Sequence, residues 1–418
     1  MTPIGIAIRN LRTRLGQTLL TAVVIALGVG LALGVIVLSA GLKRGLIVAG
    51  GPFEIVVGPK GSATQLVVSS VLLQDLPIGN LSYAQYEQVR ADERIRDAIP
   101  IALGDNVGGL RIVGTTTELF AVAVTPALGP FYAFATGRPF VADFEAVLGN
   151  TAAQQLGLSV GAEFMSGHGV IGGIAGEAHE GEYYRVVGIL APTDSPADLG
   201  VYVPLSSYWR VHAPFTGSIF APAELPAAFA ALTPDEQRTL GVTAVLVRAR
   251  TISASYQVYQ AYNSGPELQA ALPGLVLTQF LDLLGQGQRV LALVTYVALG
   301  MAALSVALTL YGAVLARQRD IAVLRALGAR RSTVLLIAVC EAAMLAVLGI
   351  VLGLFLGHAI AGEIAARVAA RSALAVPLRF ELAELWVVFA MFALGIGGGV
   401  LPAIRAYRLE AASVLAGV

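Results

Sequence analysis

Two histidines and several carboxylates lie close together in one glycine-rich stretch of the sequence. His168 and His179 are accompanied there by Glu177, Glu180 and Glu182. Imidazole nitrogens and carboxylate oxygens are ligands that zinc and related divalent ions prefer. A metal site needs these side chains to converge on one ion, and the loop between the two histidines does not enforce such convergence. His168 and His179 are therefore candidate metal ligands, and solvated loop histidines are the alternative that we favour.

Nucleotide-binding chemistry is not indicated by the sequence. Neither Lys43 nor Lys60 lies in a G-x4-G-K-[ST] phosphate loop. The single cysteine, Cys340, has apolar neighbours, which favours a packed thiol over a reactive one. We therefore predict no catalytic residue and no cofactor in this chain.

One acidic residue, Glu341, lies inside an apolar stretch, a short distance from its start. Ionisable residues at membrane depth are costly and often functional. We expect Glu341 to pair with an arginine of the preceding segment, which is a structural role. A proton or substrate site is the alternative.

An arginine-rich segment, 317–331, separates two apolar stretches. Its apolar residues fall on one helical face, its charges fall on another, and a glycine ends the pattern, which predicts a short amphipathic helix along the membrane surface. Such a segment is either a loop that sets membrane topology or a docking helix for a soluble partner. The candidate docking residues are Arg317, Arg319, Asp320, Ile321, Leu324, Arg325, Leu327 and Gly328.

The composition indicates an integral membrane protein. Of 418 residues, 56% are hydrophobic and 13% are charged, and the net charge is zero. Soluble domains carry about 25% charged residues. A neutral chain offers no basic field for nucleic acid, so we expect no nucleic-acid partner.

Four apolar stretches have the length of about 20 residues that a membrane-spanning helix needs. Arginines concentrate in both tails and in 317–331, which places these segments in the cytoplasm. The predicted segments are a cytoplasmic N-terminal segment (1–17), helix one (18–41), an extracytoplasmic α+β domain (42–288), helix two (289–316), the arginine segment (317–331), helix three (332–361), a short outer loop (362–383), helix four (384–404) and a cytoplasmic tail (405–418).

Glycines recur at four-residue spacing in two of these helices. The third helix carries Gly349, Gly353 and Gly357, and the first carries Gly30 and Gly34. This spacing lets helix backbones approach closely. We therefore predict that these faces pack against other helices.

The outer domain alternates β-rich runs with helical pieces. Gly157 follows a predicted helix and suits its C-terminal cap. The predicted strands are 54–57, 65–70, 146–149, 184–190, 201–205 and 242–250, and the predicted helices are 83–96, 151–156, 255–262 and 265–271.

With its order of elements, the chain resembles the permease subunits of MacB/LolC/FtsX-type ABC transporters. Arg317–Ala329 is similar to the family loop R-R-E-I-G-V-L-R-A-L-G-A, with Asp320 in place of Glu and Ala322 in place of Gly. Glu341 fits a glutamate common after this loop, and Leu401–Arg408 is similar to the family's closing pattern. Segment Gly51–Asn80 looks peculiar to a subgroup.

The resemblance implies a bacterial inner-membrane permease whose partner is a cytoplasmic ABC ATPase, which binds ATP and Mg and docks on 317–331. It also implies a second permease copy in a homo- or heterodimer, contact with membrane lipid, and a periplasmic protein as a further partner. The expected function is export, or extraction of a lipid-linked or periplasmic substrate. The alternative is a signalling scaffold that moves no substrate.

Overall fold

The computed structural model describes residues 2–123, 129–169, 178–316, 330–372 and 374–408. The chain divides into two compact units. The helical unit comprises 1–42, 283–366 and 377–418, and the outer unit comprises 43–282 and 367–376. The candidate docking residues, 317–328, lie outside the described residues.

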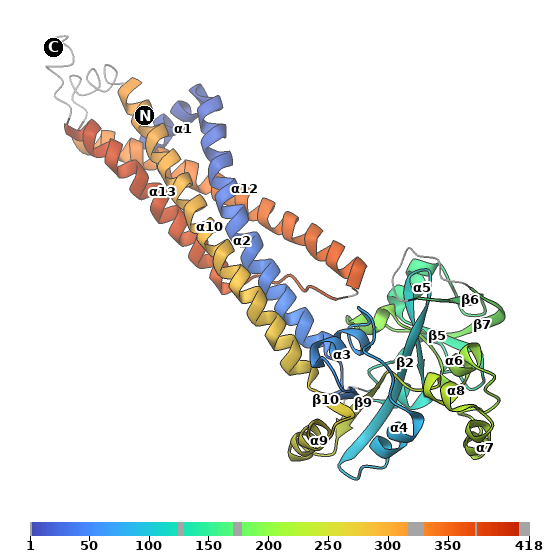
Figure 1. Cartoon of the computed structure of the whole chain (residues 1–418). Coiled ribbons are helices and arrows are strands. Elements are labelled where there is room, and N and C mark those ends of the chain that lie inside the picture. Colours follow the sequence, from blue (N-terminus) through green and yellow to red (C-terminus); the bar gives the residue numbers. More distant parts are fainter. Residues whose placement is uncertain (1, 124–128, 170–177, 317–329, 373, 409–418) are drawn as a thin grey trace. The chain divides into compact units, whose positions relative to one another are not determined.

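Helices make up the helical unit (Figure 1). They are α1 (Pro3–Thr13), α2 (Leu15–Ala49), α10 (Pro273–Ala316), α12 (Arg331–Ser372) and α13 (Leu382–Arg408). Three of them, α2, α10 and α12, continue into residues of the outer unit. Among the described residues, three spans are long and apolar enough to cross a membrane, namely Leu15–Ala49, Pro273–Thr309 and Ser332–Ser372. The apolar run of α13, Leu382–Gly398, is shorter, so the fourth span stays a prediction.

The helices extend beyond the apolar stretches recognised in the sequence. Helix α10 begins at Pro273, before the predicted start at 289, and α12 continues to Ser372, past the predicted end at 361. Residues 362–372 are therefore helical where the sequence suggested a loop. The polar side chains of these helical ends hide them from a search for apolar stretches.

One apolar cluster joins the long helices. It includes Val29 of α2, Val306 of α10, Leu345 of α12 and Met391 of α13, all almost fully buried. The glycines spaced four residues apart in α2 and α12 lie where these helices pack together, as the sequence predicts. A Cβ atom on Gly353 would lie 2.7 Å from Cβ of Val29, and one on Gly30 would lie 3.3 Å from the carbonyl oxygen of Gly353. Helices α2 and α12 therefore approach each other closely because glycine has no side chain.

A mixed sheet forms the centre of the outer unit. Its order is β10-β1-β9-β2-β3-β8-β5-β7-β4, with β6 paired to β2 and β7. The strands are β1 (Ile55–Pro59), β2 (Ile95–Val107), β3 (Leu110–Thr115), β4 (Phe134–Gly137), β5 (Glu145–Leu148), β6 (Glu163–His168), β7 (Ala178–Leu190), β8 (Val201–Pro204), β9 (Ala244–Ala249) and β10 (Leu268–Ala271).

Apolar residues alternate along these strands, so the sheet has a buried core on each face. Ile55 and Val57 of β1 join the first core, whereas Val56 between them joins the second. Trp209 is fully buried in the first core, and its indole nitrogen donates to the carbonyl of Gly241 at 3.2 Å.

Short helices cover both faces of the sheet (Figure 1). They are α3 (Ala63–Ser70), α4 (Tyr83–Arg90), α5 (Asn150–Leu156), α6 (Leu205–His212), α7 (Leu225–Ala230), α8 (Pro234–Thr239) and α9 (Ile252–Ser264), with 3-10 turns η1 (Thr117–Ala121), η2 (Pro196–Leu199) and η3 (Pro222–Glu224).

Two predictions for the outer domain are wrong, and a third is too long, because the predicted helix 83–96 ends at Arg90 and strand β2 begins at Ile95. Residues 65–70, predicted as a strand, belong to α3, because the Ser62 side chain accepts from the backbone N–H of Gln65 and caps a helix. Residues 265–271, predicted as helical, contain strand β10, whose pairing with β1 overrides the local pattern. The predicted cap at Gly157 is confirmed, with φ at 65° in the left-handed region.

Candidate functional site

Strands β1 and β10 connect the outer unit to the apolar helices that flank it in sequence. Strand β1 follows α2, and β10 ends shortly before α10 begins at Pro273. The two strands pair antiparallel with Val56 opposite Ala271 and Pro59 opposite Leu268. We call β1 and β10 the return strands. Both connections of the outer unit to α2 and α10 therefore enter through one hydrogen-bonded pair of strands.

Lys60 fastens the end of the return strands to helix α9. Its ammonium group donates to the carbonyl oxygens of Asn263 and Gly265, each at 2.8 Å, and its backbone N–H donates to the carbonyl of Glu267. A single cationic group thus closes the C-terminus of α9, where carbonyls lack helical partners. Part of the segment Gly51–Asn80 therefore supports the connection between α9 and β10.

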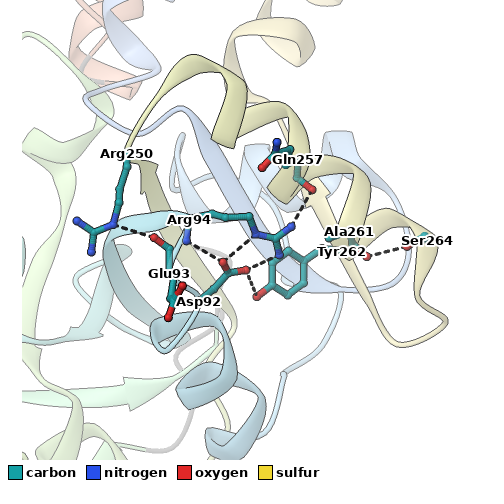
Figure 2. A network of polar contacts seen from close by, with 8 residues as sticks. All are labelled: Asp92, Glu93, Arg94, Arg250, Gln257, Ala261, Tyr262 and Ser264. Atoms are coloured by element: carbon teal, nitrogen blue, oxygen red, sulfur yellow. Dashed lines mark hydrogen bonds and ion pairs between the residues drawn. The ribbon is translucent and has the colours of Figure 1, made fainter.

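Helix α9 is also held at the turn that follows α4 (Figure 2). The carboxylate of Asp92 accepts from Nη2 of Arg94 at 2.6 Å and from the Tyr262 hydroxyl at 3.4 Å. Nη1 of Arg94 donates to the carbonyl of Gln257 at 3.4 Å. The hydrogen bond from Arg94 keeps the pKa of Asp92 below its ordinary value, although partial burial acts in the opposite direction.

A further link runs from the end of β9 to the same turn. Nε of Arg250 donates to the carbonyl of Glu93 at 2.8 Å (Figure 2). The contacts of Arg94 and Arg250 therefore fix α9 and the end of β9 to the start of β2, which pairs antiparallel with β9.

Glu341 lies in α12 and is almost fully buried, with 6% of its surface exposed. Its Oε1 accepts a hydrogen bond from Nδ2 of Asn10 in α1. The arginine segment with which a pairing was expected lies largely outside the described residues. The contact with Asn10 was not predicted, because an uncharged amide so far away in sequence gives no pairing signal.

The structure brings His168 together with Asp105 and His212. Oδ1 of Asp105 lies 3.4 Å from Nδ1 of His168 and 3.2 Å from Nε2 of His212. The three ligand atoms all lie within 4.8 Å of one another. His179 lies in β7 and is not part of this cluster. Asp105 and His212 come from distant parts of the sequence, so local spacing could not reveal them as partners of His168.

The electrostatics of His212 reflect burial and Asp105 together. Burial alone would lower the pKa of His212, but the hydrogen bond and the charge of Asp105 and the Tyr208 carbonyl raise the pKa above its ordinary value. His212 Nδ1 lies 2.7 Å from the carbonyl oxygen of Tyr208. A ring N–H at Nδ1 therefore satisfies this carbonyl, and Nε2 is the nitrogen directed to Asp105.

The letters Gly157-x-Ser159-x-Gly161 match the pattern of a hydrolase nucleophile elbow. That elbow requires a turn from a strand into a helix. Here the turn follows helix α5 and leads into strand β6, which is the reverse order. The described structure therefore does not support a serine nucleophile at this position.

Two family models match the chain in tandem. The MacB-like periplasmic core domain matches residues 18–251, and the FtsX-like permease C-terminal domain matches residues 292–411. The first match alone covers more than half of the chain. The chain belongs to the MacB/FtsX-type permease family. The resemblance recognised in the sequence is therefore confirmed.

Solved outer domains of related transporters are similar to this permease at low identity. The periplasmic region of MacB from Actinobacillus actinomycetemcomitans is 12% identical with a TM-score of 0.32, and the match covers 55% of this chain and 94% of that one. The extracellular domain of the noncanonic ABC-type transporter YknZ from Gram-positive bacteria is 10% identical with a TM-score of 0.28, covering 52% and 98%. No curated protein matches the permease in sequence.

The two family models leave the middle of the permease between them. Residues 252–291, which contain α9, β10 and the first part of α10, belong to neither match. These are the residues that carry the chain from the outer unit back into the long helices. Lys60 and Arg94 hold the α9 part of this segment, through the carbonyl oxygens of Asn263, Gly265 and Gln257.

Proposed function

We propose that this permease transmits ATP-driven motion of a separate ATPase subunit to its outer unit. The work done there is export, or extraction of a lipid-linked or periplasmic substrate. The observation that carries the proposal is the pairing of β1 with β10. Strand β1 follows α2 after residues 50–54, and β10 leads into α10 after residue 272. A displacement of either helix acts on the same pair of strands, so the outer unit receives the motion of both at one edge of its sheet.

The membrane topology of the proposal follows from the helices and the arginines. Three described helices are long and apolar enough to span a bilayer, and we assign the fourth span to α13. Arginines in both tails and in 317–331 favour the cytoplasm of a bacterial inner membrane for these segments. The outer unit then lies on the periplasmic side.

The partners of the proposal follow from surfaces of the helical unit. ATP and Mg bind to a separate ATPase subunit, because the permease carries no phosphate loop of its own. This ATPase docks on 317–331, whose sequence is arginine-rich and amphipathic. Helix α10 exposes large apolar side chains, including Leu293, Tyr296 and Met301, each at least 64% exposed. Their exposure supports contact with membrane lipid and with a second permease subunit.

Charge reversal in the docking segment tests the proposal. We expect Arg319→Glu combined with Arg325→Glu to abolish co-purification of the ATPase and its stimulation by the permease. The matched control is Arg238→Glu in the outer unit, where the side chain is 82% exposed and pairs only with an exposed aspartate among the described residues. Undiminished binding and stimulation in the double variant would contradict the docking role.

A further inference from the structure

Three side chains from three elements of the outer unit converge on one point. Asp105 lies in β2, His168 ends β6, and His212 ends α6. Asp105 and His168 are direct partners in the antiparallel pairing of β2 with β6. The sheet register therefore places their side chains next to each other, and α6 brings the second imidazole to the same carboxylate.

The distances in this cluster fit a shared metal ion. A tetrahedral zinc ion with bonds of about 2.0–2.1 Å separates its ligand atoms by about 3.3 Å. Oδ1 of Asp105 lies 3.2 Å from Nε2 of His212 and 3.4 Å from Nδ1 of His168. The remaining separation, between the two imidazole nitrogens, is at most 4.8 Å. His168 is half exposed, so its ring can rotate to shorten the distance between the two imidazole nitrogens.

The surroundings of the cluster hold its ligands in the required form. His212 Nδ1 lies 2.7 Å from the Tyr208 carbonyl, an arrangement in which Nδ1 carries the proton and Nε2 offers its lone pair to a metal. The carboxylate of Asp105 is 1% exposed. The end of β6 is fixed because the Asn106 amide donates to the carbonyl of Gly169 at 2.7 Å.

We propose that Asp105, His168 and His212 bind one divalent transition-metal ion of the zinc class. Two imidazole nitrogens and one carboxylate suit zinc, cobalt or nickel, whereas calcium and magnesium require mostly oxygen ligands. Three protein ligands leave a coordination position for water or for a donor from another molecule. The ion connects β2, β6 and α6, and the half-exposed His168 leaves it accessible from solvent. This site does not depend on the proposed coupling to an ATPase.

Cobalt binding tests the proposal directly. The full-length permease, purified in detergent without a histidine tag and stripped with a chelator, is titrated with Co²⁺ and followed by calorimetry and visible absorption. We expect one Co²⁺ per chain, with the absorption bands of a four- or five-coordinate ion. An excess of Mg²⁺ leaves binding unchanged, because magnesium prefers six oxygen ligands.

Three variants separate this site from other metal binding. Changes to groups that only hydrogen-bond to a metal ligand weaken metal binding by roughly 10–100-fold. His168→Ala and Asp105→Asn each remove a ligand itself, so we expect them to weaken Co²⁺ binding by at least as much. The matched control, His179→Ala, binds as the wild type does. Absence of a bound ion, wild-type affinity in both ligand variants, or equal loss in the His179 variant would overturn the proposal. If Asp105→Asn fails to fold, the half-exposed His168 position decides the test.

Discussion

Replacing Gly353 with alanine tests the packing of α2 against α12. The added Cβ would lie 2.7 Å from Cβ of Val29 and 3.0 Å from the carbonyl oxygen of Ala26. Carbon atoms pack best at about 3.5–4.0 Å, so the two helices have to separate by about 1 Å. Overpacking of this kind costs about 1–3 kcal/mol. Because one neighbouring atom belongs to the backbone, a change of rotamer cannot relieve the contact.

The matched control is Gly397→Ala in α13, where no atom lies within 4 Å of the added Cβ. Alanine stabilises a helix by up to about 1 kcal/mol relative to glycine, so the control variant should be neutral or stabilised. Thermal unfolding of both variants in the same detergent shows which change destabilises the protein and which does not. We expect the apparent Tm to fall by a few degrees for Gly353→Ala and to hold or rise for Gly397→Ala.

A second substitution checks the cause of the loss. Val29→Gly removes both side-chain atoms that approach the new Cβ, so the double variant with Gly353→Ala should lose less stability than the sum of the single variants. If Gly353→Ala is as stable as Gly397→Ala, α2 and α12 do not pack as described, and the reasoning fails.

Further predictions concern polar contacts in both units. Glu341→Ala removes the acceptor of the Asn10 amide and should cost about 1.5–3 kcal/mol, whereas Glu341→Gln, which keeps an acceptor oxygen, should cost less in thermal unfolding. Trp209→Phe loses a buried hydrogen bond and should destabilise the outer unit by about 1–3 kcal/mol. Thermal unfolding followed by circular dichroism measures this loss, and an unchanged Tm would contradict it. Since the pKa of Asp92 is lower in the folded chain, its contact with Arg94 stabilises the fold above about pH 4 and loses this effect as pH falls through the folded pKa. The Tm difference between wild type and Asp92→Asn should therefore shrink on acidification, and a constant difference would contradict the assignment.

Helix packing and local caps were predictable from sequence because they depend on near neighbours. The four-residue glycine spacing predicted faces that pack against other helices, since a missing Cβ is visible in the sequence itself. The structure adds that the faces of α2 and α12 pack against each other. The left-handed residue Gly157 was equally predictable, because only its own backbone conformation matters.

Elements that depend on distant partners were not predictable. Strand β10 is short, and only its pairing with β1 makes it a strand. The last part of α12, residues 362–372, lacks the apolar composition by which membrane-spanning helices are recognised in a sequence. Asp105 and His212 reach His168 through the sheet register and the position of α6, which no local spacing reveals.

The central claim is that motion of the long helices reaches the outer unit through the return strands. A flexible four-residue Gly-Ser insertion after Leu272, between β10 and α10, interrupts this connection. The control insertion follows Val160, which is 45% exposed in the turn between α5 and β6. Spin labels at Arg238 of two paired permeases, in complex with the ATPase, report the distance between outer units with and without ATP. We predict that the distance change persists in the control and is lost after the Leu272 insertion while ATP hydrolysis continues. An unchanged ATP-dependent distance change in the Leu272 variant would contradict the account.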